Sequence, residues 1–204
     1  MRFLNSKFYS IAETLTNFFF LNIIWLVMCL PIFTIFPATA AMFGVIRQWI
    51  INKDTSVFRT FFKMFKENFK HSFIIGTTWM IYLGVATIDY LVINQWDSYV
   101  KTIIVAVLLA IGLLLSLVSI RVFPMMVHFN LPLSGLIKNS FSFSLLYLPT
   151  TLLMIIILAV MMASLYFAPI TFLFIFSLTA YIIYYLCHKE FTRLEQLPNS
   201  NKTL

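Results

Sequence analysis

The stretch that decides the fold is Asp54–Ser72, with the sequence DTSVFRTFFKMFKENFKHS. On a helical wheel drawn at about 100° per residue, its large apolar side chains fall on one half. The cationic side chains share a narrow arc beside that half, and they are Arg59, Lys63, Lys66 and Lys70. This arrangement is typical of a helix that lies in a membrane interface. The stretch therefore predicts an interfacial helix over 55–71, with these four cations as its lipid-interface residues.

The composition of the chain is that of a membrane protein. Of its 204 residues, 61% are hydrophobic and 10% are charged, whereas soluble domains have about 45–50% apolar and about 25% charged residues. The net charge of +7 is concentrated in a few loops. Such clustering is typical of the positive-inside rule and does not indicate nucleic-acid binding. We therefore expect an integral membrane protein with no nucleic-acid partner.

The apolar runs predict an all-α, polytopic transmembrane helix bundle of five to six membrane segments. The segments lie at about 18–35, 37–51, 73–93, 103–120, 145–167 and 170–186, and a polar tail follows at 188–204. A helix over 37–51 is roughly 21 Å long, which is shorter than the ~30 Å hydrocarbon core. That segment is therefore either a tilted short span or a re-entrant one. All of these elements belong to a single integral membrane domain over 1–204.

The positions of Lys and Arg orient the chain. If 37–51 returns to the starting side, every Lys and Arg residue except Lys101 lies in the cytoplasm, as the positive-inside rule favours. If 18–35 is the only early span, the amino terminus lies outside. We favour the first arrangement. Both predict a multi-pass protein with a cytoplasmic carboxyl terminus.

Pro31 and Pro37 predict a break between the first two segments, because each proline disfavours helix at the residue before it. Small residues follow the second proline, at Ala38, Thr39 and Ala40. Small side chains allow helices to approach closely. The same residues also occur in helices without any special packing role, and both interpretations stay open. We therefore expect a tight helix break at the two prolines.

The two halves of the chain share a weak internal correspondence. The aligned pairs are Lys66 with Lys138, Phe69 with Phe141, Ser72 with Ser144 and Thr78 with Thr150. Each half would contain an inward helix, a helix along the cytoplasmic face and an outward span, as in the parallel repeats of some transporters. Four identities also arise by chance in so biased a composition, and both explanations stay open.

Asp89 is the acidic residue that falls inside a predicted span. An ionisable side chain within a membrane is by default a functional candidate. Asp89 lies near the outer end of 73–93, however, and a side chain so close to the interface also reaches water by snorkelling. We retain it as the candidate intramembrane polar residue, and a proton relay would need a second such group.

The chain lacks the patterns of catalysis, cofactor binding and metal binding. It has no phosphate-cradling glycine loop, no G-x-S-x-G and no H-E-x-x-H motif. His71, His128 and His188 each fall near a cytoplasmic membrane edge, but no local pair has the spacing of metal ligands. We therefore expect a protein without enzymatic activity, with no cofactor and no metal.

Two other functional classes stay open. Gly135 precedes Leu146–Pro149 ahead of the last two segments, which resembles the ATPase-docking loop of ABC permease subunits. The E-A-A element of that loop is absent, and the spacing is one residue too long. A divergent permease subunit is therefore one alternative. A self-sufficient small-solute transporter, with Asp89 and the broken helices along its path, is the other.

Two motifs carry a resemblance to a known family. They are N-x-x-W-L-x-x-x-L-P-I-x-T-I-x-P-A-T-A-A at Asn22–Ala41 and F-K-x-N-F-K at Phe65–Lys70. The chain resembles the YesL-like family, small integral membrane proteins of Gram-positive bacteria that are classified by a domain of unknown function. Where many members have glycine before P-A-T, this chain has Phe36.

The resemblance brings no catalytic residues. It implies a bacterial cell membrane, and it implies that members accompany carbohydrate-uptake transporters and sensor kinases. We therefore expect a non-catalytic accessory of carbohydrate uptake or sensing. Its expected partners are anionic lipid headgroups and subunits of an ABC transporter or a sensor kinase.

Overall fold

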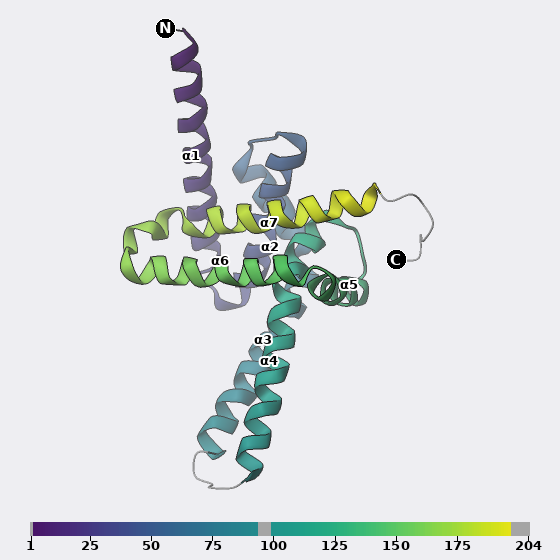
Figure 1. Ribbon diagram of the computed structural model, residues 1–204. Helices are drawn as coiled ribbons and strands as arrows, with labels where there is room; N and C mark the ends of the chain where they lie inside the picture. The colour runs from purple at the N-terminus through teal and green to yellow at the C-terminus, as the bar shows by residue number, and fades with distance from the viewer. Residues whose placement is uncertain (1, 94–98, 197–204) are drawn as a thin grey trace.

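The computed structural model describes residues 2–93 and 99–196, and these residues form helices without any strand (Figure 1). The α-helices are α1 (Arg2–Met28), α2 (Ile35–Arg47), α3 (Val57–Ile93), α4 (Tyr99–His128), α5 (Leu133–Leu146), α6 (Leu148–Phe167) and α7 (Ile175–Glu195). Short helical turns at Ile32–Thr34, Gln48–Asn52 and Pro169–Leu173 join some of them. The predicted all-α fold class is confirmed.

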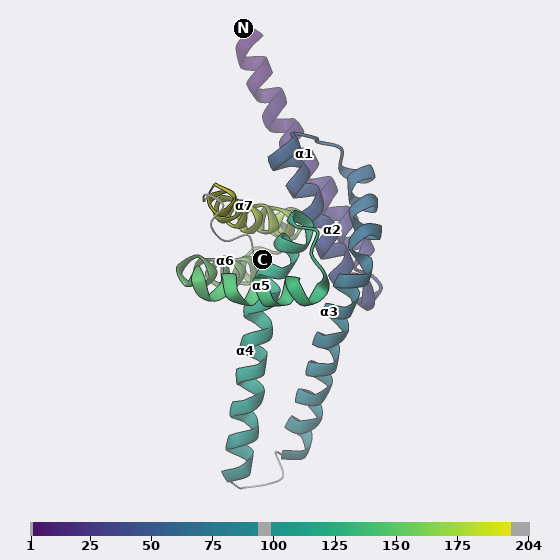
Figure 2. The ribbon, with the colours of Figure 1, turned by 90° about the vertical axis from the view of Figure 1, so that its right-hand side faces the viewer.

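The helices form a packed body from which a two-helix arm extends. Helices α1 to α4 run roughly along one direction, and the antiparallel pair α6 and α7 lies crosswise to them (Figures 1 and 2). Helix α2 packs along the first part of α3. The second part of α3 and the first part of α4 continue side by side beyond the body and form the arm (Figure 2).

Four helical segments of the described chain are long and apolar enough to cross a membrane. They are Ile32–Asn52, Val57–Val92, Lys101–His128 and Leu148–Phe167. A shorter apolar helix, Ala12–Met28, coincides with part of the first predicted segment. These segments confirm the predicted polytopic bundle. The last predicted segment, 170–186, is not among them, and the helix that covers most of it carries charged side chains in its second half.

The structure differs from the sequence prediction along α3. We predicted an interfacial helix over 55–71 that is separate from a span over 73–93, whereas α3 is continuous from Val57 to Ile93. Ser72, at the expected junction, is buried, and its hydroxyl donates to the Asn68 carbonyl of the preceding turn (2.6 Å). The Ser72 hydroxyl is therefore hydrogen-bonded within the helix and does not interrupt it. At about 55 Å, α3 is longer than the ~30 Å hydrocarbon core.

The end of the chain also differs from the prediction. We predicted 145–167 and 170–186 as the last two membrane segments of the bundle, and the α6–α7 pair that covers most of them lies crosswise to α3 and α4 (Figure 1). We also expected a polar tail from 188, but α7 continues to Glu195 and buries Glu190 and Phe191. Residues 197–204 of that tail lie outside the described residues.

The turn between α1 and α2 lies at the two predicted prolines. Pro31 immediately precedes the helical turn Ile32–Thr34, and Pro37 lies in the first turn of α2, where proline is well tolerated. The Thr34 hydroxyl lies within hydrogen-bonding distance of the Met28 carbonyl (2.5 Å) and the Pro31 carbonyl (2.6 Å). The Met28 carbonyl at the end of α1 therefore has a hydrogen-bond partner within the turn itself.

The two copies of the proposed repeat have their helices in a similar order but differ in shape. In the first copy α2 is followed by α3, and in the second copy α4 is followed by α5 and α6. Ser72 and Ser144, which the alignment pairs, are both fully buried. However, α3 is continuous, whereas α5 and α6 are separated at Tyr147 and Pro149 opens the following helix. The repeat therefore stays a prediction.

Close packing of α2 on α3 yields a stability test at Gly44. A Cβ atom at Gly44 would lie 2.7 Å from Met64 Cβ, so Gly44→Ala should destabilise the protein by about 1–3 kcal/mol through overpacking. Gly84→Ala is the matched control, because a Cβ there meets nothing within 4 Å. It should be neutral or stabilising by up to ~1 kcal/mol. Thermal unfolding in mild detergent measures both, and equal effects would contradict the close approach.

Candidate functional site

A buried ion pair lies at the centre of the body. Arg121 of α4 is 1% exposed, and it pairs with Glu190 of α7, which is 5% exposed. The Arg121 Nε group donates to Thr151 Oγ1 (3.0 Å), and its Nη2 group donates to Thr150 Oγ1 (2.9 Å) and to the Tyr147 carbonyl (3.2 Å). Thr150 Oγ1 also donates to Glu190. Both charges are therefore hydrogen-bonded, which is the condition for keeping an ion pair away from water.

The pair joins three elements of the fold, namely α4, the start of α6 and α7. Sequence reasoning missed it for two reasons. Arg121 directly follows the span predicted at 103–120, which would place it at a membrane edge, although α4 continues to His128. Glu190 was assigned to a polar tail. The apolar residues on both sides of Arg121, Ile120 and Val122, were the available signal that this cation is buried.

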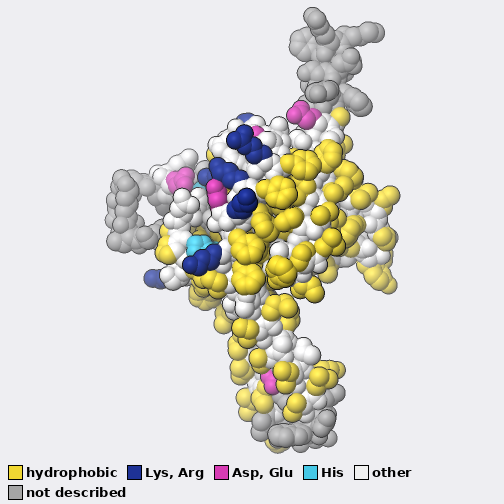
Figure 3. All heavy atoms as spheres, turned by 180° about the vertical axis from the view of Figure 1, so that it is seen from behind, with side chains coloured by type: hydrophobic (Ala, Val, Ile, Leu, Met, Phe, Trp, Pro, Cys, Tyr) yellow, Lys and Arg dark blue, Asp and Glu magenta, His cyan; other side chains and the backbone are white. Residues whose placement is uncertain are grey.

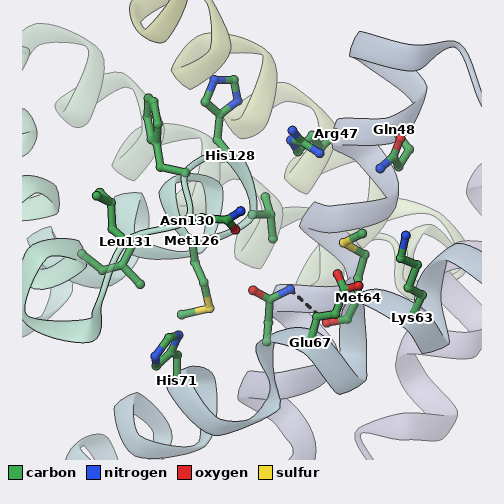
Figure 4. Close-up of a pocket in the computed structure, with 14 residues that line it drawn as sticks. Arg47, Gln48, Lys63, Met64, Glu67, His71, Met126, His128, Asn130 and Leu131 are labelled. Carbon is green, nitrogen blue, oxygen red and sulfur yellow. Dashed lines mark hydrogen bonds between the residues drawn. The ribbon is translucent and has the colours of Figure 1, made fainter.

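A basic pocket of about 520 Å³ opens beside this core, at the end of the molecule where α2 ends and α3 begins (Figure 4). Its polar lining residues are Arg47, Gln48, Lys63, Glu67, Asn68, His71, His128 and Asn130. Met64, Met126 and Leu131 are among the apolar residues of the wall. The pocket therefore combines cations from α2 and α3 with residues at the turn between α4 and α5.

Contacts with α7 hold His128 at the rim of this pocket. Its Nδ1 atom lies 3.0 Å from the Tyr184 hydroxyl, and its Nε2 atom lies 3.5 Å from a Glu195 carboxylate oxygen. The His188 ring lies 5.8 Å from the His128 ring, centroid to centroid. Within the described residues, however, no three His, Cys, Asp or Glu side chains are grouped so that they could hold a metal ion.

The four predicted lipid-interface cations Arg59, Lys63, Lys66 and Lys70 are exposed on the first part of α3. Figure 3 shows Lys and Arg side chains gathered on the part of the body away from the arm, next to a wide apolar surface. The apolar side chains on this part of α3 differ in exposure: Phe61 is fully buried, while Phe58 and Phe62 are exposed. Lys63 differs from Lys66 and Lys70 in that it also lines the basic pocket.

Asp89 lies far from these groups, on the part of α3 that belongs to the arm. It is half-buried and lines a mostly apolar groove of about 320 Å³ together with Tyr82, Tyr90 and Lys101. Among the described residues that line this groove, Asp89 is the sole acidic one. The structure therefore brings Asp89 close to Lys101 and to tyrosines, and not to a second carboxylate.

Comparisons with known proteins point to one family. A family model described as "Protein of unknown function, DUF624" matches residues 18–90. The chain is 31% identical to the uncharacterized protein YesL of Bacillus subtilis, over 90% of this chain and 88% of that relative. It is 29% identical to the uncharacterized protein YteU of the same organism, over 91% of this chain and 85% of the relative. No solved structure shows a significant match.

The hydroxyl group of Thr151 offers a test of the buried cluster. Thr151→Val keeps the shape of the side chain but removes the acceptor of two Arg121 donors, at 3.0 and 2.9 Å. We expect a loss of about 1–3 kcal/mol in the free energy of unfolding. The control is Thr87→Val, which removes an exposed hydroxyl that bonds the Leu83 carbonyl of its own helix and should change stability by less than about 0.5 kcal/mol. If thermal unfolding finds the two variants equally stable, the Arg121 donors do not depend on Thr151.

Proposed function

Since the chain belongs to the YesL-like DUF624 family, we propose that it is a non-catalytic accessory protein of a bacterial cell membrane. In this role it assembles with other membrane proteins that take up or sense carbohydrates. The family resemblance supports the choice of partners. The structure supports the mode of action, because the charges of Arg121 and Glu190 are paired inside the body while the apolar side chains of the arm are left exposed.

The single observation that carries the proposal is the construction of the arm. Its two helices are held together by Trp79, whose indole N–H donates to Ser119 (2.7 Å), and by Tyr82, whose hydroxyl donates to the Leu108 carbonyl (3.0 Å). Large apolar side chains are more than half exposed along both helices, and they include Ile81, Ile88, Leu91, Ile103, Leu109 and Leu113. Two packed helices cannot enclose a path for a solute, but they present a long surface to lipid or to other helices.

Gly84 is the point on the arm that best fits a partner helix. It is exposed, and a Cβ atom there would meet nothing within 4 Å. Met80 and Ile88, one turn away on either side, are more than half exposed. A glycine weakens an isolated helix, whereas on a membrane helix it allows the backbone of a second helix to approach closely. We assign Met80, Gly84 and Ile88 as the partner-contact surface.

The basic end of the molecule supports a cytoplasmic orientation for that end. Exposed cations near an anionic membrane surface contribute about 1 kcal/mol each, and four of them lie on the first part of α3. Lys101 lies instead on the arm. In this arrangement the arm crosses the membrane away from the cytoplasm, and the carboxyl terminus remains on the cytoplasmic side.

Affinity purification of the tagged, full-length protein from the membranes of its own host tests the proposal. In mild detergent, we expect subunits of an ABC transporter or a sensor kinase to co-purify with the wild-type protein. Gly84→Leu should reduce their recovery several-fold, because the larger side chain prevents close helix approach. The control is Val107→Leu, which adds bulk at an exposed position of α4 and should leave recovery unchanged.

The opposite outcome would favour the rival function. If the folded protein is recovered alone in good yield and moves a solute across liposome membranes, it is a self-sufficient transporter. In that case Asp89, the acidic residue that lines the arm groove, becomes the first residue to replace.

A further inference from the structure

The basic pocket contains one buried hydrogen-bond donor that has no partner among the described residues. The Nε atom of Arg47 is buried, and no hydrogen-bond partner for it occurs among the described residues. Lys63 and His71 line the same cavity from α3, and His128 lines it from the end of α4 (Figure 4). A buried donor without an acceptor is costly. The pocket therefore favours a ligand that brings negatively charged acceptor oxygens.

Phosphate oxygens match this set of donors. A guanidinium group presents a planar fork of N–H groups that fits two phosphate oxygens at once, and an ammonium group adds a compact positive charge. Arg47 and Lys63 supply one group of each kind, from different helices. The Gln48 and Asn130 side chains supply neutral amide donors at the same cavity.

Glu67 determines what else the ligand must carry. It is the acidic residue among those that line the pocket, and it lies one helical turn from Lys63 and from His71 on α3. An ionised carboxylate repels phosphate oxygens but accepts hydrogen bonds from hydroxyl groups. A bare inorganic phosphate would therefore use only part of the site. A ligand with a phosphate at one end and hydroxyl groups at the other would use all of it.

We propose that this pocket binds a phosphate ester that carries free hydroxyl groups. The phosphate lies at Arg47 and Lys63, and the hydroxyl groups donate to Glu67. A volume of about 520 Å³ falls within the range of about 300–1,000 Å³ that is usual for small-molecule sites. The same chemistry occurs in the headgroup of phosphatidylglycerol and in soluble polyol phosphates such as glycerol 3-phosphate, and the experiment below distinguishes these two sources.

The experiment uses the full-length protein in nanodiscs of phosphatidylcholine that contain a small fraction of phosphatidylglycerol. Native mass spectrometry measures the lipid retained, and calorimetry measures binding of glycerol 3-phosphate in nanodiscs without phosphatidylglycerol. Arg47→Gln and Lys63→Gln should each weaken binding of the active probe about tenfold or more, as expected for the loss of a charge-assisted hydrogen bond. The control is Lys138→Gln, which removes the same charge from an exposed position of α5 outside the pocket lining and should bind as the wild type does.

Replacement of Glu67 tests the hydroxyl half of the proposal. Glu67→Ala should abolish the preference of the protein for phosphatidylglycerol over phosphatidic acid, whose headgroup has no hydroxyl-bearing substituent. Retention of phosphatidylglycerol alone assigns the ligand to the bilayer, and binding of glycerol 3-phosphate assigns it to solution.

Three results would overturn the proposal. They are binding of neither probe, unchanged binding of the active probe by Lys63→Gln, and, where the lipid is the active probe, a wild-type protein without preference for phosphatidylglycerol over phosphatidic acid. Lys63 is exposed, so its replacement remains informative even if Arg47→Gln fails to fold.

Discussion

The ion pair between Arg121 and Glu190 is the interaction on which the arrangement of the body depends. The two residues are 69 positions apart in the chain, and they join the middle of the molecule to its last helix. Removing one charge would leave the other buried without its partner, at a cost of about 3–5 kcal/mol. Because the start of α6 also bonds Arg121, through Thr150 and Thr151, the same pair fixes the crosswise position of the α6–α7 hairpin.

Residues of the motif that carries the family resemblance attach α1 to the rest of the body. Asn22 is fully buried, donates to the Phe172 carbonyl (2.7 Å) and accepts from the Ser177 backbone N–H (3.2 Å). Trp25 donates to Thr39 across the α1–α2 turn (3.2 Å). The motif therefore encodes how α1 is attached to α2 and α7. Its role in the fold explains why a resemblance based on it identifies a family without indicating a reaction.

The sequence predicted the features that depend on local pattern. Apolar runs indicated the helices, Pro31 and Pro37 indicated the turn between α1 and α2, and the spacing of the cations indicated an exposed basic arc on α3. The sequence did not predict that α3 is continuous, because the change from charged to apolar residues near Ser72 resembles the end of a helix. The Ser72 hydroxyl, however, donates to a carbonyl of the same helix. The Arg121–Glu190 pair and the basic pocket could not be predicted, since they join residues far apart in the chain and spacing carries no information about such contacts.

A double-mutant cycle on the ion pair, measured as the free energy of unfolding in mild detergent, tests whether Arg121 and Glu190 hold α4, α6 and α7 together. The cycle compares Arg121→Met, Glu190→Leu and the double variant with the wild type. We predict that each single replacement costs about 3–5 kcal/mol and that the double variant costs much less than their sum, because it leaves no unpaired charge. Additive losses would show that the two side chains do not interact, and the account of how α4, α6 and α7 are held together would then be wrong.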